Sequence, residues 1–242
     1  MLKEEPVLEV QHVCAGYGNR KKYRQVLFDV DFCLNRGEIL GLVGESGCGK
    51  STLSKTILGF VPVKSGQVIH HTTRPQMIFQ DPFSSLNPAK KVGWILEEPL
   101  RMQKEKLSAS ARRERAEAFA EKVGLDRELL NRYPRELSGG QRQRVSIAIS
   151  LIQGSRLILA DEPVSALDVT IQRQIMELML TLQEELNLSY LFISHDLDVI
   201  YQMCDWVMVM EKGRIVESGP AEQIFQEPKH SYTKTLLESS FF

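Results

Sequence analysis

The sequence is poor in the features that mark metal-binding, secreted and membrane-spanning chains. Its four cysteines lie far apart and form no Cys-x-x-Cys pair, which argues against a structural zinc site and against a disulfide framework. No apolar run approaches the roughly 18–20 residues that a membrane-spanning helix needs. The opening residues, Met-Leu-Lys-Glu-Glu-Pro, have neither the basic start nor the apolar stretch of a secretory signal. We therefore expect reduced thiols and a chain that is either soluble or peripheral to a membrane through a partner.

A surplus of either charge is also missing. The 30 Lys and Arg residues stand against 31 Asp and Glu residues, which gives a formal net charge of −1. Because nucleic-acid binders usually carry a basic surplus, DNA and RNA are not expected partners. Internal repeats and low-complexity segments are absent as well. With 242 residues, 43% of them hydrophobic, the chain is long enough for one large domain or two small lobes, and we expect a single domain, 1–242.

What the sequence does contain is an alternation of short apolar strands with helical patterns. This alternation predicts an α/β fold with a largely parallel sheet. The segment 7–34 differs, because it reads as strands joined by a polar turn at 18–22 and predicts an antiparallel sheet beside the core. Further along, Asp168 is predicted to cap a helix that runs through Leu186.

An inserted helical segment is predicted between two parts of the core. Residues 82–137 begin with turn-forming residues and continue with helical stretches around 93–101 and 108–123. We therefore predict an α-helical subdomain at 82–137. The remaining segments, 1–81 and 138–242, are predicted to form the β subdomain and the core lobe.

A glycine-rich segment at 44–51 fits the phosphate-loop pattern Gly-x-x-x-x-Gly-Lys-Ser at every fixed position. An apolar strand precedes it and a helix is predicted to begin near Lys50, so the backbone N–H groups and the helix N-terminus can surround a polyphosphate. Lys50 is predicted to reach the β- and γ-phosphates of a nucleotide, and the Ser51 hydroxyl to bind Mg²⁺. The candidate cofactor-binding residues of this segment are Gly44, Glu45, Ser46, Gly47, Cys48, Gly49, Lys50, Ser51 and Thr52.

Polar side chains follow three further predicted strands. The apolar run 157–160 ends in Asp161 and Glu162, and beside a phosphate loop we expect Asp161 to hold Mg²⁺ and Glu162 to act as general base on the attacking water. Gln80 follows a predicted strand and is placed to touch both Mg²⁺ and that water. His195 follows another and is placed to contact the γ-phosphate. Taken alone, a single glutamine or histidine is more often structural.

Cys48 lies inside the phosphate-loop segment. A helix N-terminus and Lys50 beside it predict a lowered pKa for its thiol, inactivation by thiol reagents and protection by MgATP. The alternative is a buried, unreactive cysteine.

With these motifs in this order, the chain resembles the nucleotide-binding subunit of an ABC transporter over nearly its whole length. The resemblance rests on an aromatic Tyr17, the phosphate loop, Gln80, the segment Leu-Ser-Gly-Gly-Gln at 137–141, the Asp-Glu strand end, Ser-Ala-Leu-Asp at 165–168 and Ser-His-Asp at 194–196. It implies an ATPase with a P-loop NTPase core of the RecA-like kind. It also implies that Tyr17 stacks on adenine, and that Ser138, Gly139, Gly140 and Gln141 contact the γ-phosphate of ATP held by a second subunit. Asp168 would couple the two sites of such a head-to-tail dimer.

Finer features are similar to the oligopeptide, dipeptide and nickel importer branch of that family. They are the segments 79–88, 95–99, 137–144 and 227–237. The resemblance implies solute import driven by ATP and Mg²⁺ at the cytoplasmic face of the cell membrane. It implies transmembrane permease subunits, a second ATPase subunit (this chain or a paralogue) and an extracellular solute-binding protein as partners.

Three other classes of protein fit the sequence less well. An ABC ATPase of translation or DNA repair usually fuses two cassettes or carries a coiled-coil insertion, and neither feature is present. A kinase or GTPase has no place for Leu-Ser-Gly-Gly-Gln, and the guanine-specificity motif Asn-Lys-x-Asp is missing. A scaffold without catalysis is disfavoured by intact Lys50, Asp161, Glu162 and His195.

Overall fold

The computed structural model describes residues 5–19, 22–73, 75–81, 85–103 and 106–239. Within them, a central sheet has the strand order β5-β6-β7-β3-β8-β9, in which neighbours pair in parallel except for the antiparallel edge strand β9. This arrangement confirms the predicted α/β fold. The strands are β3 (Ile39–Val43), β5 (Gln76–Ile78), β6 (Leu157–Asp161), β7 (Ser189–Ile193), β8 (Trp206–Glu211) and β9 (Arg214–Pro220).

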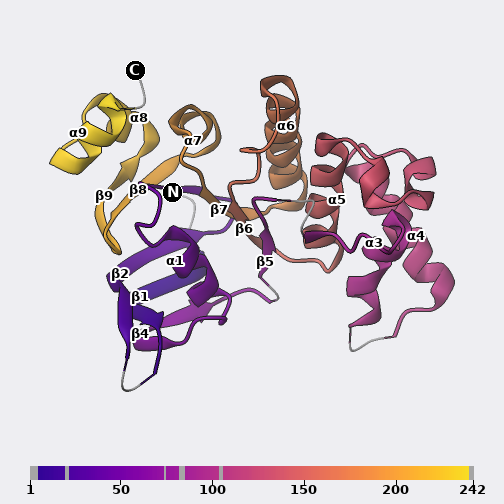
Figure 1. Ribbon diagram of the computed structural model, residues 1–242, viewed down its shortest axis with the longest axis horizontal. Helices are drawn as coiled ribbons and strands as arrows, with labels where there is room; N and C mark the ends of the chain where they lie inside the picture. Colours follow the sequence, from indigo (N-terminus) through magenta and orange to yellow (C-terminus); the bar gives the residue numbers. More distant parts are fainter. Residues whose placement is uncertain (1–4, 20–21, 74, 82–84, 104–105, 240–242) are drawn as a thin grey trace.

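A second sheet, antiparallel throughout, lies below the first in Figure 1. It consists of β1 (Pro6–Tyr17), β2 (Arg24–Asn35) and β4 (Val63–His70), with β1 in the middle. The predicted antiparallel sheet beside the core is therefore confirmed, although the sequence pattern does not predict β4. The middle of the predicted turn at 18–22 lies outside the described residues.

The two faces of the central sheet bury different side chains, as the alternation along each strand requires. Leu40 and Leu42 of β3 join the apolar cluster formed with β1, β2 and the helix α1 (Lys50–Ile57). Ile39 and Val43 of the same strand join the cluster formed with the other helices. Because both faces are covered, the site must lie at an edge of the sheet.

Four helices that follow strands of the central sheet cover the face of that sheet opposite to α1 and the antiparallel sheet. They are α6 (Val169–Leu186), α7 (Leu197–Met203), α8 (Ala221–Gln226) and α9 (Ser231–Glu238). Asp168 caps α6 as predicted, since its carboxylate accepts a hydrogen bond from the N–H of Ile171 at 3.1 Å. In Figure 1, α8 and α9 lie beside β9, at the opposite end of the molecule from α3 and α4.

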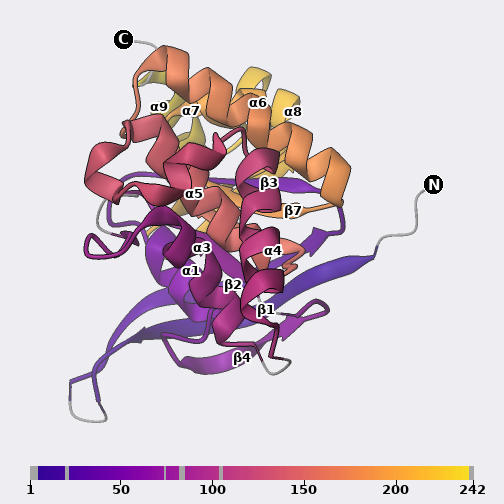
Figure 2. The same cartoon turned by 90° about the vertical axis from the view of Figure 1, so that its right-hand side faces the viewer.

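The remaining helices form a group to one side of the sheet. They are α3 (Val92–Arg101), α4 (Ala109–Lys122), the 3₁₀ turns η1 (Arg127–Asn131) and η2 (Pro134–Glu136), and α5 (Gly139–Ile152). The helices α3 and α4 match the predicted stretches, whereas part of the predicted turn-rich start, at 82–84, lies outside the described residues. Figure 2 shows this group in front of the sheet, with α5 behind α3 and next to α6. Buried side chains from α3, α4 and α5 belong to the same apolar cluster as those of the central sheet.

The parallel strands β3, β5, β6 and β7 place the functional segments at one edge. Their carboxyl ends lead into residues 44–49, Gln80, Glu162 and His195, in that order. The crevice outside the carboxyl ends of an open parallel sheet is where ligands bind in such folds. Among the described residues, no helix is long and apolar enough to cross a membrane.

Candidate active site

A pocket of about 440 Å³ opens at this edge of the sheet. Four segments far apart in the sequence contribute to it, which brings the predicted loop together with the predicted carboxylates, Gln80 and His195. The residues that line it are Ser46, Gly47, Gly49, Lys50, Ser51, Thr52, Gln80, Asp161, Glu162 and His195.

The phosphate loop follows β3 as a tight turn. Gly44, Gly47 and Gly49 have φ of +149°, +80° and +123°, a region that L side chains rarely adopt. A Cβ atom on Gly44 would lie 2.2 Å from the carbonyl oxygen of Met210, so the loop can approach β8 only because no side chain is present there. Helix α1 begins at Lys50 directly after Gly49, which has no side chain to cap it. The N–H groups of this helix end are therefore available to an anion.

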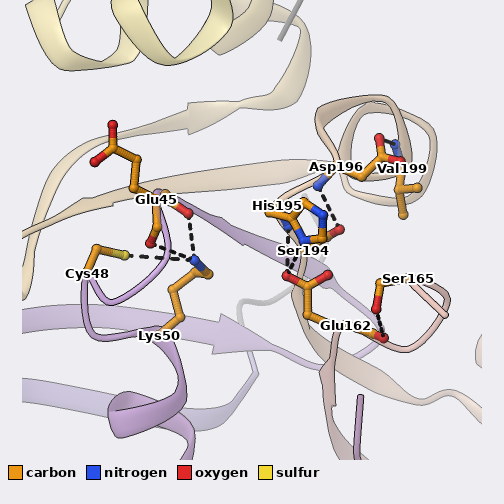
Figure 3. A network of polar contacts seen from close by, with 10 residues as sticks. Glu45, Cys48, Lys50, Glu162, Ser165, Ser194, His195, Asp196 and Val199 are labelled. Carbon is orange, nitrogen blue, oxygen red and sulfur yellow. Dashed lines mark hydrogen bonds and ion pairs between the residues drawn. The ribbon is translucent and has the colours of Figure 1, made fainter. Parts of the chain in front are cut away.

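The ammonium group of Lys50 is held by the loop. It donates hydrogen bonds to the carbonyl oxygens of Gly44 at 2.6 Å and of Glu45 at 3.1 Å. Figure 3 shows this group turned to the loop on one side of the site, with Glu162 and His195 on the other side. The lysine is buried, yet it lines the pocket. A cation fixed in this way favours a phosphate in the pocket.

Glu162 has an unusual backbone conformation and a side chain held by His195. Its φ of +52° lies in the left-handed region, which a residue other than glycine adopts at a cost of about 1–3 kcal/mol. Its Oε1 accepts hydrogen bonds from the backbone N–H of His195 at 3.0 Å and from the imidazole Nδ1 at 2.7 Å. Its Oε2 is buried and has no hydrogen-bond partner among the described residues. A buried acceptor without a partner is ready to bind a water molecule.

The neighbouring Asp161 shares the pocket with Ser51 and Gln80. Burial raises the pKa of Asp161, and the charge of Glu162 raises it further, whereas a hydrogen bond from Ser51 and the charge of Lys50 act in the opposite direction. A hydroxyl, a carboxylate and an amide supply hard oxygen ligands, which suit Mg²⁺. No group of three His, Cys, Asp or Glu residues in the described part of the chain could hold a metal by itself. A Mg²⁺ ion bound here would therefore need phosphate and water oxygens as its remaining ligands.

Comparison with known proteins decides the family. The family described as ABC transporter matches residues 27–165. The chain belongs to the ABC transporter family. It is 47% identical, over 89% of its length and 70% of the relative's, to the dipeptide transport ATP-binding protein DppF of Haemophilus influenzae. It is 43% identical, over 98% of its length and 78% of the relative's, to the oligopeptide transport ATP-binding protein OppF of the same organism.

Solved structures agree with this assignment. The chain superposes on CbiO1 of Clostridium perfringens, part of the ABC transporter complex CbiONQ, with a TM-score of 0.82 at 27% identity, covering 93% of this chain and 92% of that one. It also resembles the ATP-binding cassette MJ0796, solved as a dimer in a post-hydrolysis state with ADP and Pi, with a TM-score of 0.77 at 26% identity, covering 88% and 98%. The predicted ABC ATPase is confirmed.

The ABC signature segment lies outside the pocket. Ser138 caps α5, since its hydroxyl accepts from the N–H of Gln141 at 3.3 Å and the Gln141 side chain accepts from the N–H of Ser138 at 2.9 Å. Gly140 is required by packing, because a Cβ atom there would lie 2.6 Å from the side chain of Ile171. Among the described residues, neither Ser138, Gly139, Gly140 nor Gln141 lines the pocket that contains Lys50. Within one chain, the structure therefore does not bring residues 138–141 to the pocket that contains Lys50.

Tyr17 lies beside the phosphate loop. Its hydroxyl is 3.3 Å from Oγ1 of Thr52, and its side chain is 45% exposed. An exposed aromatic ring next to a polyphosphate loop is suited to stacking on a base. Its predicted contact with adenine stays a prediction.

The prediction of a lowered pKa for Cys48 is wrong. The residue is only 8% exposed, and burial raises the pKa of its thiol, although the nearby Lys50 ammonium acts in the opposite direction. The sequence placed the lysine correctly but could not show the burial, and here desolvation outweighs the charge. The alternative of a buried, unreactive cysteine is the one that the structure supports.

Thiol labelling should reflect this burial. At pH 7.5 we expect N-ethylmaleimide to modify the exposed Cys33 faster than Cys48 by about tenfold or more, because the thiolate is the reacting species and a raised pKa lowers its fraction. Peptide mass spectrometry over time measures both rates in the same sample. Modification of Cys48 at the rate of Cys33 would contradict the buried geometry.

Two features of the site escaped the sequence. The bond between Glu162 and His195 joins residues 33 positions apart. A contact of Tyr232 with the phosphate loop joins residues 187 positions apart. For the contact of Tyr232, the sequence contains one signal, the segment 227–237. It resembles a family feature, but the sequence assigns it no role.

Proposed function

We propose that this chain hydrolyses ATP at a dimer interface to drive peptide import through a membrane permease. The observation that carries the proposal is the pocket that joins Lys50, Asp161, Glu162 and His195 in a chain of the ABC transporter family. The peptide class is supported by the names of the relatives, which are dipeptide and oligopeptide transport ATP-binding proteins.

Each side chain has a role that its geometry allows. The loop N–H groups and Lys50 bind the phosphates, while Ser51, Asp161 and Gln80 would hold a Mg²⁺ ion. When bound, this ion neutralises charge on the phosphate oxygens. The free oxygen Oε2 of Glu162 orients a water molecule and accepts its proton. His195 holds the carboxylate through its backbone N–H and its ring Nδ1, and its imidazole is proposed to contact the γ-phosphate.

The second half of each site is proposed to come from a partner subunit. The exposed end of α5 at Ser138 carries N–H groups that suit an anion, but it does not line this chain's own pocket. A head-to-tail dimer would bring it to the γ-phosphate on the partner. The dimeric cassette that resembles this chain supports such an arrangement.

Replacing Ser138 tests this division of labour. In Ser138→Asp the carboxylate can still cap α5, so the fold should be kept, but its charge should repel the partner's γ-phosphate. We expect ATP turnover to fall by about 10-fold or more, with the dissociation constant of ATP for the monomer changed by less than about twofold. The matched control Ser138→Asn caps equally well without charge and should retain most of the activity. Equal loss in both variants would contradict an electrostatic role.

The remaining proposals concern assembly. Residues 82–137 are proposed as a helical subdomain that contacts the cytoplasmic part of the permease, supported by the separate placement of α3 and α4 (Figure 1). The complete system would include a second ATPase subunit and an extracellular solute-binding protein at a cell membrane. ATP-dependent peptide uptake into vesicles that contain the co-purified permease is the direct test. Uptake without ATP hydrolysis would reject the proposal.

A further inference from the structure

The C-terminal helix α9 touches the phosphate loop through one side chain. The hydroxyl oxygen of Tyr232 accepts a hydrogen bond from the backbone N–H of Glu45 at 3.0 Å. Glu45 is the residue after Gly44, where β3 turns into the loop. Helix α9 otherwise lies beside β9, at the opposite end of the molecule from α3 and α4 (Figure 1). The contact therefore links the end of the chain to the nucleotide pocket.

Tyr232 is fixed in place from two directions. The carboxylate of Glu217 on β9 accepts hydrogen bonds from the backbone N–H groups of Lys229 at 2.8 Å and His230 at 3.0 Å, which anchors the entry to α9. The side chain of His230 then caps the helix, since its Nδ1 accepts from the N–H of Tyr232 at 3.2 Å. Leu237 is buried in the core. These contacts fix the position of Tyr232, so its hydroxyl can hold the phosphate loop in one conformation.

The bond constrains the peptide groups that hold Lys50. The N–H of Glu45 is directed to Tyr232, while the carbonyl oxygen of the same residue accepts from Nζ of Lys50 at 3.1 Å and from the N–H of Cys48 at 3.3 Å. Both backbone polar groups of Glu45, the N–H and the carbonyl oxygen, are therefore hydrogen-bonded within the chain. Burial raises the pKa of Tyr232, so the oxygen that accepts this bond belongs to a neutral hydroxyl near pH 7.

We propose that Tyr232 is a positioning residue of the nucleotide site, which holds residues 44–45 so that the phosphate loop is preformed for ATP. This inference rests on the proposed function, because it assumes that ATP binds at Lys50. Under this proposal, the segment 227–237 contributes to the nucleotide site through Tyr232. Preorganising a loop improves affinity by reducing the ordering that binding requires.

The test is the variant Tyr232→Phe, which removes one oxygen atom and keeps the ring. We expect the dissociation constant and the KM for ATP to rise about fivefold, which corresponds to the roughly 1 kcal/mol of one hydrogen bond, and kcat at saturating ATP to stay within twofold. Tyr201→Phe is the control, because Tyr201 on α7 is half-exposed and packs edge-on against Phe225 with ring centroids 5.1 Å apart. It should leave KM and kcat unchanged.

A double-mutant cycle locates the effect. Glu45→Pro removes the N–H group that Tyr232 accepts from, so Tyr232→Phe should cause no further loss of affinity in that background. Unchanged affinity in Tyr232→Phe alone, or an undiminished effect in the Glu45→Pro background, would overturn the inference. If Glu45→Pro does not fold, the comparison of the two Tyr→Phe variants still decides. A wild-type chain that fails to bind MgATP would instead reject the proposed function.

Discussion

Glu162→Gln should abolish most of the ATP turnover, by about 10²–10⁴-fold, while ATP still binds. The reason lies in the two carboxylate oxygens. Oε1 accepts from the backbone and the ring of His195, and an amide oxygen can do the same, so the local geometry should be kept. Oε2 is buried and has no hydrogen-bond partner in the described part of the chain, and an amide nitrogen in its place can donate but cannot accept a proton from water.

The measurement combines turnover with the state of association. Because hydrolysis is blocked after binding, a dimer that requires ATP should accumulate in Glu162→Gln and should appear in size-exclusion chromatography with MgATP. Glu184→Gln on the exposed side of α6 is the control for the loss of one charge and should behave as wild type. Normal turnover in Glu162→Gln would reject the assignment of the general base.

Lys50→Ala should act on binding instead. The ammonium group bridges two loop carbonyl oxygens and lines the pocket, and its removal takes away a charge-assisted contact to phosphate as well as a support of the loop. Hydrogen bonds to charged groups contribute about 1.5–3 kcal/mol each, so the dissociation constant of ATP should rise by about 10- to 100-fold. Titration calorimetry on the purified chain measures this change directly.

The control for Lys50→Ala comes from the same helix. Lys55→Ala makes the same chemical change on the exposed side of α1, so effects of helix propensity or net charge would appear in both variants. Only Lys50→Ala should lose affinity. Equal losses would mean that the general charge of the helix, rather than the contact with the loop, attracts the nucleotide.

Much of the candidate site could be predicted because its functional residues lie in short segments with a characteristic spacing. The loop at 44–51 needs glycines at fixed spacing, and the acids at 161–162 follow an apolar strand, so both are readable without knowing the fold. The order of strands along the chain then predicts that their carboxyl ends meet. That edge is where the structure brings together Lys50, Gln80, Asp161 and His195.

Burial and distant pairing could not be predicted in the same way. The pKa of Cys48 depends on how much water reaches its thiol, which the packing of the loop against the two strands β2 and β8 controls. Strand β4 was missed because it is exposed and polar over most of its length, so it carries no apolar alternation. It is recognised only by its pairing with β1.

The sequence by itself determined the family, the phosphate-binding loop and the identity of the acids, since these depend on residue types at close spacing. The tertiary structure decided which oxygen of Glu162 is free, that Cys48 is protected, that the signature end of α5 stays outside its own pocket, and that Tyr232 reaches Glu45. The physical reason is that desolvation and hydrogen bonding depend on neighbours in space, and only the folded chain brings residues 187 positions apart within 3.0 Å.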